Sequence, residues 1–279
     1  MEHAGRYRPL KSRSASAFVV VPLACLALTL PACEESTIAD LPYIERIVVQ
    51  SILDPREDSL FVLFSRTLPL SETYDNSKAV LTDVDASIIA FDGNSYRLVH
   101  VGGGRYTAPG LTLVPGGWYE LRASWNGKSV GGRTTIPLSP VVREATQAPS
   151  GTGTTVTSLV EARDGEVYGQ TWELHTASGW SSGGSFTEIR RGEDAGSDGL
   201  LELAEAYGFT PAANETLYAV VHAFDRPFYD YFISRGGNLP GYDDLLFRPV
   251  GGYVSWNVTG DGIGLFLGRA VARRRTEGP

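Results

Sequence analysis

Short stretches of alternating apolar and polar residues follow one another along the chain from Ile44 onward. In the stretch 60–68, Leu60, Val62 and Phe64 share one face, and this period of two is typical of a half-buried β-strand. Turn signals separate the stretches, and Asn126-Gly127 is the strongest hairpin signal among them. Further strands are predicted at 47–49, 86–91, 96–101 and 118–125. We therefore expect an immunoglobulin-like β-sandwich over residues 41–138.

Proline and small polar residues interrupt this pattern between Thr134 and Thr155, which predicts a domain boundary there. Beyond it we expect a second β-rich domain with two short helices over 140–275. One helix would begin at Ser197 or Asp198, because residues 200, 203, 204 and 207 fit one helical face. Asp225 would cap the other helix, with Pro227 in its first turn.

The C-terminal pattern predicts a hairpin over 254–268. Val254, Trp256 and Val258 alternate, and a glycine-rich turn separates them from a second apolar strand. We expect this hairpin to close the core of the second domain, with Trp256 buried in it.

The first 32 residues have the order of a bacterial signal peptide. Four basic residues precede an apolar stretch over 15–32, which ends at Leu30, Ala32 and Cys33 in the arrangement of a lipobox. We expect Cys33 to be acylated and to become the mature N-terminus. An ordinary cleaved signal and an uncleaved membrane span are the alternatives, although a span needs about 20 predominantly apolar residues and Pro22 and Pro31 interrupt this stretch.

Removal of this signal would change the charge and leave no cysteine free. Of 24 basic and 32 acidic residues the signal holds four and one, so 20 and 31 remain, with a net charge of −11. Phosphate backbones and anionic headgroups repel such a chain, so we expect no nucleic acid partner. Residues 33–40 form an acidic tether, which is either a surface-export signal or a solvated linker.

Several segments of the mature chain together resemble the Bacteroidota lipoproteins called the domain of unknown function 4249 family. They are Ile47-Val48-Val49, 64–70, 85–88, Gly104-Arg105-Tyr106, 117–121, Thr135-Ile136-Pro137, 228–232 and 260–266. The resemblance implies an outer-membrane lipoprotein that is often associated with TonB-dependent transport, and it supplies no catalytic residues. The chain departs from the family in its short length, in a Gly/Ser-rich loop near 179–185 and in its Arg273-Arg274-Arg275 ending.

Motifs with catalytic or metal-binding chemistry are weak. Residues 179–183 match a nucleophile elbow around Ser181, but a strand-like segment follows where the mechanism needs a helix. The mature histidines, His100, His175 and His222, lack paired ligand spacing, so we expect no metal site and no cofactor. We interpret the glycine-rich segment 260–264 as a tight turn rather than a nucleotide loop.

Aromatic residues are dense over 224–253 and alternate with arginines, which indicates either core packing or a recognition surface. Phe228, Tyr231 and Phe232 would be core. The candidate contact residues are Tyr242, Asp243, Asp244 and Arg248, in a stretch too polar for a core and too aromatic for a linker.

The sequence therefore favours a non-catalytic, lipid-anchored accessory or binding protein of the outer membrane, on its periplasmic or cell-surface face, that cooperates with a TonB-dependent transporter. An adhesion or envelope-structural lipoprotein is the first alternative. An uncharacterised hydrolase is the second.

Overall fold

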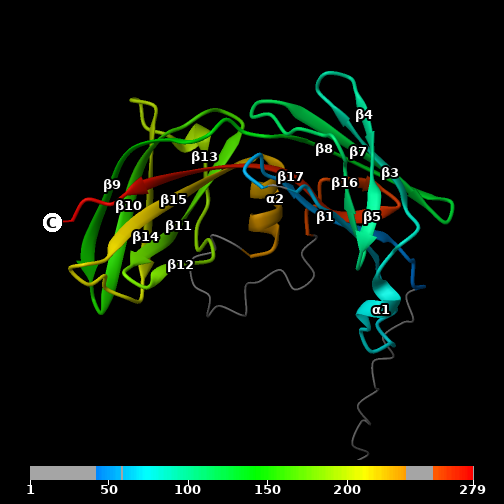
Figure 1. Cartoon of the computed structure of the whole chain (residues 1–279), viewed down its shortest axis with the longest axis horizontal. Coiled ribbons are helices and arrows are strands. Elements are labelled where there is room, and N and C mark those ends of the chain that lie inside the picture. Colours follow the sequence, from blue (N-terminus) through cyan, green and yellow to red (C-terminus); the bar gives the residue numbers. More distant parts are fainter. Residues whose placement is uncertain (1–41, 58, 237–253, 279) are drawn as a thin grey trace, which may run out of the picture. The chain divides into compact units, whose positions relative to one another are not determined.

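The computed structural model describes residues 42–57, 59–236 and 254–278, and it confirms a mainly β protein (Figure 1). The chain divides into two units, Met1–Tyr43 and Ile44–Pro279, and the elements described below belong to the second. The strands are β1 (Ile47–Leu53), β2 (Val62–Arg66), β3 (Asp85–Ala90), β4 (Ser95–Arg97), β5 (Val99–Gly102), β6 (Arg105–Thr107), β7 (Trp118–Trp125), β8 (Lys128–Thr135), β9 (Val141–Ser150), β10 (Gly153–Glu161), β11 (Glu166–Thr176), β12 (Gly179–Gly183), β13 (Arg190–Arg191), β14 (Leu200–Tyr207), β15 (Thr216–Asp225), β16 (Val258–Gly260) and β17 (Gly262–Arg275). The helices are α1 (Asn76–Ala79), α2 (Pro227–Ser234) and the 3₁₀ helix η1 (Gly192–Asp194).

Strands from both ends of this unit enclose the larger core. A five-stranded sheet has the order β16-β8-β7-β3-β4, and β1, β2, β6 and β5 are consecutive strands of a nine-stranded sheet. Apolar side chains of the two sheets alternate inward and form one cluster, whose largest fully buried members include Phe64, Tyr106, Tyr119 and Phe266. Burying several aromatic rings of this size contributes much of the stability of such a core.

A second sandwich forms from the remaining strands. The three-stranded sheet β14-β10-β9 packs against the part of the nine-stranded sheet made by β11 and β15. Tyr168 and Val221 are fully buried between the two layers, together with Val160 and Leu201. The interior face of β15 is thus formed by its odd-numbered residues, and its even-numbered residues lie on the other face.

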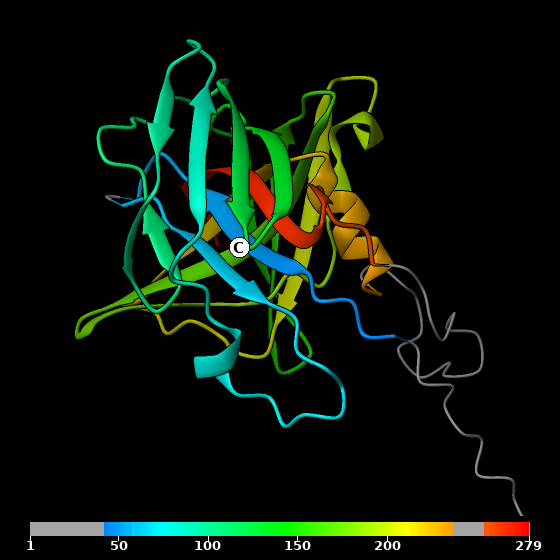
Figure 2. The ribbon, with the colours of Figure 1, turned by 90° about the vertical axis from the view of Figure 1, so that its right-hand side faces the viewer.

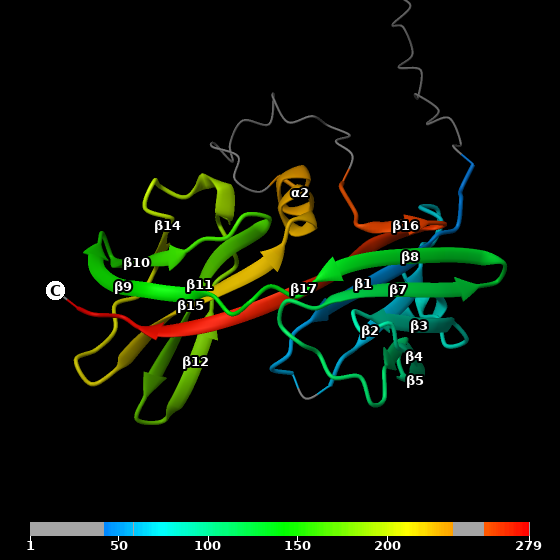
Figure 3. The same ribbon diagram turned by 90° about the horizontal axis from the view of Figure 1, so that it is seen from above.

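Strand β17 takes part in both groups of strands (Figure 3). Residues 262–268 pair in parallel with β1, and residues 269–275 pair antiparallel with β15. Figure 2 shows the blue β1 beside the red β17. The predicted hairpin is therefore wrong, because β16 pairs with β8 and not with β17. Val258 and Phe266 lie in the first core rather than in the second. Trp256 is 37% exposed, with its ring 5.4 Å from that of Tyr231, so it is not a core residue.

The predicted helix over 197–208 is also wrong, because residues 200–207 form strand β14. Leu201, Leu203 and Glu205 are buried while residues 202, 204 and 206 are exposed, and the strand pairs with β10 along its whole length. The apolar positions 200, 203, 204 and 207 fit a helical face, but pairing with β10 selects the alternating set. Hydrogen bonding and side-chain packing between the paired strands outweigh the local helical pattern of these residues.

The second predicted helix is confirmed as α2, with Pro227 at its first position. Its N-cap is Arg226, and Asp225 does not cap it; the Asp225 carboxylate instead accepts a hydrogen bond from Thr134. Only α2 and the 3₁₀ turn lie in the described part of 140–275, because α1 belongs to the first group of strands. No helix within the described ranges is long and apolar enough to cross a membrane.

Candidate functional site

The residues chosen from the sequence as site residues fall in parts of the chain that are not described. The lipidation candidate Cys33 and the contact candidates Tyr242, Asp243, Asp244 and Arg248 all lie outside the described residues.

The described part of the aromatic-rich segment packs against the sheet. Phe232 is buried together with Val167 and Ile189, and the rings of Phe224 and Phe228 are stacked with centroids 4.1 Å apart. Tyr229, which we expected on the opposite side of the helix, also packs against this cluster. Residues 224–233 therefore serve mainly to attach α2 to β11 and β15.

The segment that matches a nucleophile elbow is strand β12. Ser181 is opposite Leu174 in the middle of the β11–β12 pair, and the chain continues into a loop rather than a helix. A nucleophile elbow needs a sharp strand-to-helix turn that exposes the serine. The match is therefore coincidental.

Asp261 alone connects β16 to β17, and residues 262–264 already belong to β17, so the segment 260–264 is a tight connection but not the turn of a hairpin between these two strands. Gly264 has a φ of +127°, and a Cβ there would lie 2.0 Å from the carbonyl oxygen of Val49. Glycine is needed at this position because the backbones of β1 and β17 approach closely.

The isolated histidines do not form a metal site within the described residues, where no group of three or more ligand-type side chains comes together. His222 lies on the even-numbered face of β15, and its Nε2 is 2.9 Å from Thr171 Oγ1. Burial, helped by the positive charges of Arg269 and Arg56, lowers the pKa of His222 to about 3. The imidazole is therefore neutral near pH 7.

A different group of side chains lies on the face of β12, β11, β15 and β17 that points away from the three-stranded sheet. We call it the aromatic–arginine face, and its members are His175, Glu173, Trp180, Ser182, Tyr218, Arg273 and Arg275. Strand register brings them together: Trp180 is opposite His175, Ser182 is opposite Glu173, and Tyr218 is opposite both Glu173 and Arg275. Only a matched register of four strands can produce this grouping.

Glu173 lies at the centre of this face and is 5% exposed. Its Oε1 is 3.0 Å from His175 Nε2, and its Oε2 accepts a charge-assisted contact of 3.1 Å from Arg273 Nε. The His175 ring in turn lies 4.8 Å from the Tyr218 ring. One buried carboxylate thus holds an imidazole and a guanidinium in fixed positions beside a phenol.

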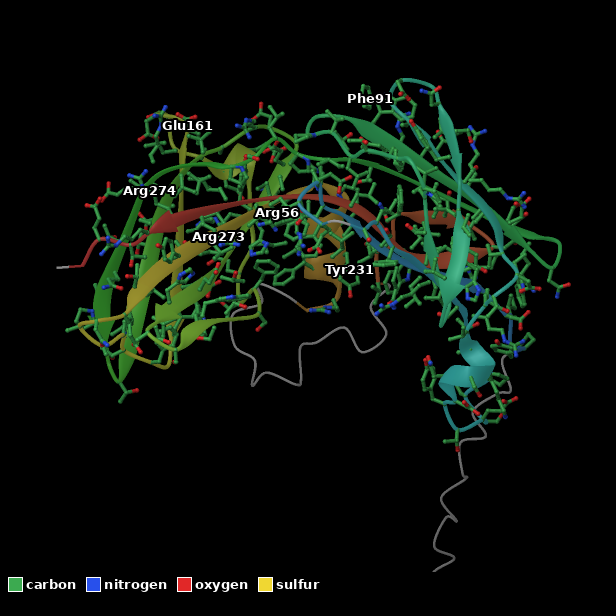
Figure 4. All side chains as sticks on the ribbon, in the orientation of Figure 1. Arg56, Phe91, Glu161, Tyr231, Arg273 and Arg274 are labelled. Atoms are coloured by element: carbon green, nitrogen blue, oxygen red, sulfur yellow. The ribbon has the colours of Figure 1, made fainter. Side chains whose placement is uncertain are left out.

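Four members of the face are exposed to solvent: Trp180, Ser182, Arg273 and Arg275. Trp180 is 66% exposed, although tryptophan usually buries most of its surface. Arg275 is the register partner of Tyr218 in the β15–β17 pair. It is exposed, and within the described ranges it makes no ion pair. Arg274, the next residue along β17, is opposite the buried Ala219 and belongs to the other face of the sheet. Figure 4 labels Arg273 and Arg274 on either side of this strand.

A second polar surface lies on the five-stranded sheet. A shallow hollow of about 730 Å³ is lined by small and hydroxylated residues, with Arg97 and Arg122 at its sides. Ser87 of β3 is the register partner of both arginines, of Arg97 on β4 and of Arg122 on β7, so the three side chains share one face of the sheet. Arg97 is bound to Asp85 and Arg122 to Glu120, and the described residues that line the hollow include no aromatic ring. It is thus less suited to an organic ligand than the aromatic–arginine face.

Buried charged groups lie where β1, β8, β15 and β17 meet. Asp54, 1% exposed, accepts hydrogen bonds from Arg56 and from Arg269, and these arginines hold the pKa of its carboxyl below the ordinary value although burial acts in the opposite direction. Among the described residues, Asp225 accepts hydrogen bonds from Thr134 Oγ1 and from the backbone N–H of Thr135, and burial raises its pKa to about 7. Figure 4 labels Arg56 in this region.

No family model and no curated protein matches this chain. Among solved structures, a proposed carbohydrate-binding protein from Bacteroides uniformis is similar at 14% identity and a TM-score of 0.19, over 64% of this chain and 89% of that one. A variant of Salmonella alpha-2-macroglobulin is similar at 13% identity and a TM-score of 0.22, over 65% of this chain and 14% of that one. With TM-scores this low, neither similarity bears on the function of this chain.

The sequence pattern did not predict the aromatic–arginine face, and His175 was considered only as a histidine without paired ligand spacing. The alternation of Thr171, Glu173 and His175 was a signal that these side chains share a face. This alternation does not specify which strands pair with the one that contains these residues.

Proposed function

We propose that this protein is a non-catalytic, lipid-anchored binding protein of the bacterial outer membrane that works with a TonB-dependent transporter. The anchor rests on the signal and lipobox order before Cys33. The transporter partner rests on the resemblance to the domain of unknown function 4249 family.

The observation that carries the binding role is the aromatic–arginine face. Tryptophan, tyrosine and arginine are the side chains most enriched at recognition sites, because each combines a large contact area with directed polar groups. On this face an exposed Trp180 lies beside His175, whose position is fixed by Glu173. Side chains that are already held in place lose little conformational entropy when a ligand binds.

A binding role accounts for this face better than a catalytic one. Both oxygens of Glu173 are engaged, by His175 and by Arg273, so the carboxylate serves to position its neighbours. The segment around Ser181 is a strand and lends no support to a hydrolase. Adhesion remains the alternative binding role, and it differs in the partner that would be captured.

The lipid anchor is tested by metabolic labelling of cells with a fatty-acid probe. Wild-type protein should carry the label, and Cys33→Ser should not, because serine lacks the thiol to which the lipid would be attached. Label that persists in Cys33→Ser would rule out the anchor.

The transporter partnership is tested by purification of the tagged full chain from detergent-solubilised outer membranes. A TonB-dependent transporter should be recovered in a constant ratio to the bait. Recovery without any transporter, combined with binding to whole cells, would contradict the accessory role and favour adhesion.

A further inference from the structure

We propose that the aromatic–arginine face binds an acidic carbohydrate, a short oligosaccharide that contains uronic acid. This inference rests on the proposed binding function and names the ligand class for that site.

The aromatic residues provide the stacking surface. Trp180 is 66% exposed on β12, His175 is its directly paired neighbour on β11, and Tyr218 lies next to His175 with ring centroids 4.8 Å apart. The axial C–H groups of a pyranose ring form an apolar face that packs flat against such rings, while its hydroxyls remain at the edge. A strip of rings across three adjacent strands suits a ligand of more than one sugar.

The polar residues around the rings match the edge of a sugar. Ser182, opposite Glu173, provides a hydroxyl, and His175 and Arg273 provide ring and guanidinium nitrogens held by Glu173. These groups include both donors and acceptors, as neighbouring sugar hydroxyls require. A purely hydrophobic ligand would leave them unpaired at a cost.

Arg275 selects for negative charge. Its neighbour Arg273 is bound to Glu173, whereas Arg275 makes no ion pair within the described ranges and is opposite Tyr218. A guanidinium binds a carboxylate in a bidentate geometry, so a uronate stacked on Tyr218 would present its carboxylate to Arg275. The whole chain carries a net charge of −8, which repels long polyanions and favours a short ligand.

The strand itself supplies a matched control. Arg274 has the same charge and a similar exposure to solvent, but it lies on the opposite face of β17 from Arg275. Replacing either arginine changes the net charge equally. A difference in ligand binding between the two variants would therefore arise from the face on which the arginine lies and not from the overall electrostatic field.

The test measures calorimetric binding of a galacturonic acid oligomer, and of the same oligomer fully methyl-esterified, to the purified full chain. The acid should bind about tenfold more tightly than the ester, a difference of about 1.4 kcal/mol. Trp180→Ala should weaken binding of both forms at least tenfold. Arg275→Gln should weaken binding of the acid about tenfold and so remove the preference for the acid over the ester, whereas Arg274→Gln should behave as wild type.

Equal binding of acid and ester by the wild type would overturn the proposal, as would the absence of binding to either form. Equal losses in Arg275→Gln and Arg274→Gln would also overturn it, because a general charge effect would then explain the preference. Thermal unfolding of each variant shows that it is folded. A chain that still recovers its transporter but binds no oligomer would retain the proposed function and lose this ligand class.

Discussion

Thr134 Oγ1 donates a hydrogen bond of 2.5 Å to Asp225 Oδ2, and so ties the end of β8 to the end of β15. The same hydroxyl oxygen accepts a hydrogen bond of 2.6 Å from the backbone N–H of Gly268 in β17. Three strands from distant parts of the sequence thus meet at one side chain. Asp225 Oδ1 is buried and has no hydrogen-bond partner within the described ranges.

This environment predicts a pH-dependent stability. Burial raises the pKa of Asp225 from 3.8 to about 7, so between these pH values the folded chain keeps a proton that the unfolded chain has released. The contribution of Asp225 to stability is therefore complete below about pH 4 and is lost as the pH rises through 7, with a total of about 4 kcal/mol. Asp225→Asn should gain stability relative to wild type across this window and stay level above it.

Urea unfolding at a series of pH values measures this difference. Asp85→Asn is the matched control, since it makes the same substitution at a side chain that is 74% exposed. A constant difference between Asp225→Asn and wild type from pH 4 to 8 would contradict the assignment.

The second prediction concerns Asp54. Arg56 Nη2 donates to its carboxylate at 2.8 Å and Arg269 Nε at 2.9 Å, while the Asp54 side chain is fully buried. The Arg56 side chain is 45% exposed and Arg269 also pairs with Glu57, so the arginines left behind keep other contacts. Asp54→Asn should therefore lower the free energy of unfolding by about 1–3 kcal/mol, the value of lost hydrogen bonds to a charged group. Because the pKa of Asp54 is lowered in the folded chain, its contribution is present above the ordinary pKa and is lost as the pH falls through the folded value.

Chemical denaturation of Asp54→Asn and of Asp85→Asn compares the loss of a buried carboxylate with the loss of an exposed one. The Arg97–Asp85 pair, with both side chains more than 70% exposed, should contribute at most about 1 kcal/mol. Similar losses in the two variants would show that Asp54 is not specially stabilising.

The third prediction separates two aromatic residues that are ten positions apart. Phe266 is fully buried in the first core, so Phe266→Ala should cost about 3–5 kcal/mol. Trp256 is 37% exposed and contacts Tyr231 at a ring distance of 5.4 Å, so Trp256→Ala should cost about 1 kcal/mol. Thermal and denaturant unfolding of the two variants should rank them in this order, and a larger loss in Trp256→Ala would place that ring in a core.

The fourth prediction tests whether the chain divides into two independent domains at the segment between β8 and β9. Leu138 is 47% exposed there, and a protease that cuts after it would separate β1 and β8 from β16 and β17. Because β17 pairs with β1 and β16 pairs with β8, the two pieces should stay together after cleavage. Size-exclusion chromatography should show one peak that gives two bands on a denaturing gel. Two separate peaks would instead favour independent domains on either side of the cut.

The sequence predicted helix α2 and several strands, among them β1, β2, β3 and β7, but it failed where two periods fit the same residues. Residues 200–207 contain both a helical set and an alternating set of apolar positions, and pairing with β10 selected the alternating one. The candidate site shows the same limit. Alternation placed Glu173 and His175 on one face, while the register with β12, β15 and β17 decided that Trp180, Tyr218 and Arg273 join them.

By itself, the sequence determined a mainly β protein with its turns at defined positions, because alternation and turn residues are local properties that act within a few residues. Only the tertiary structure decided which strands pair. Val49 lies beside Gly264, more than 200 positions away, and Phe266 completes a core that begins with Ile47. Such pairing depends on the complementary surfaces of two distant segments, and no pattern within either segment specifies its partner.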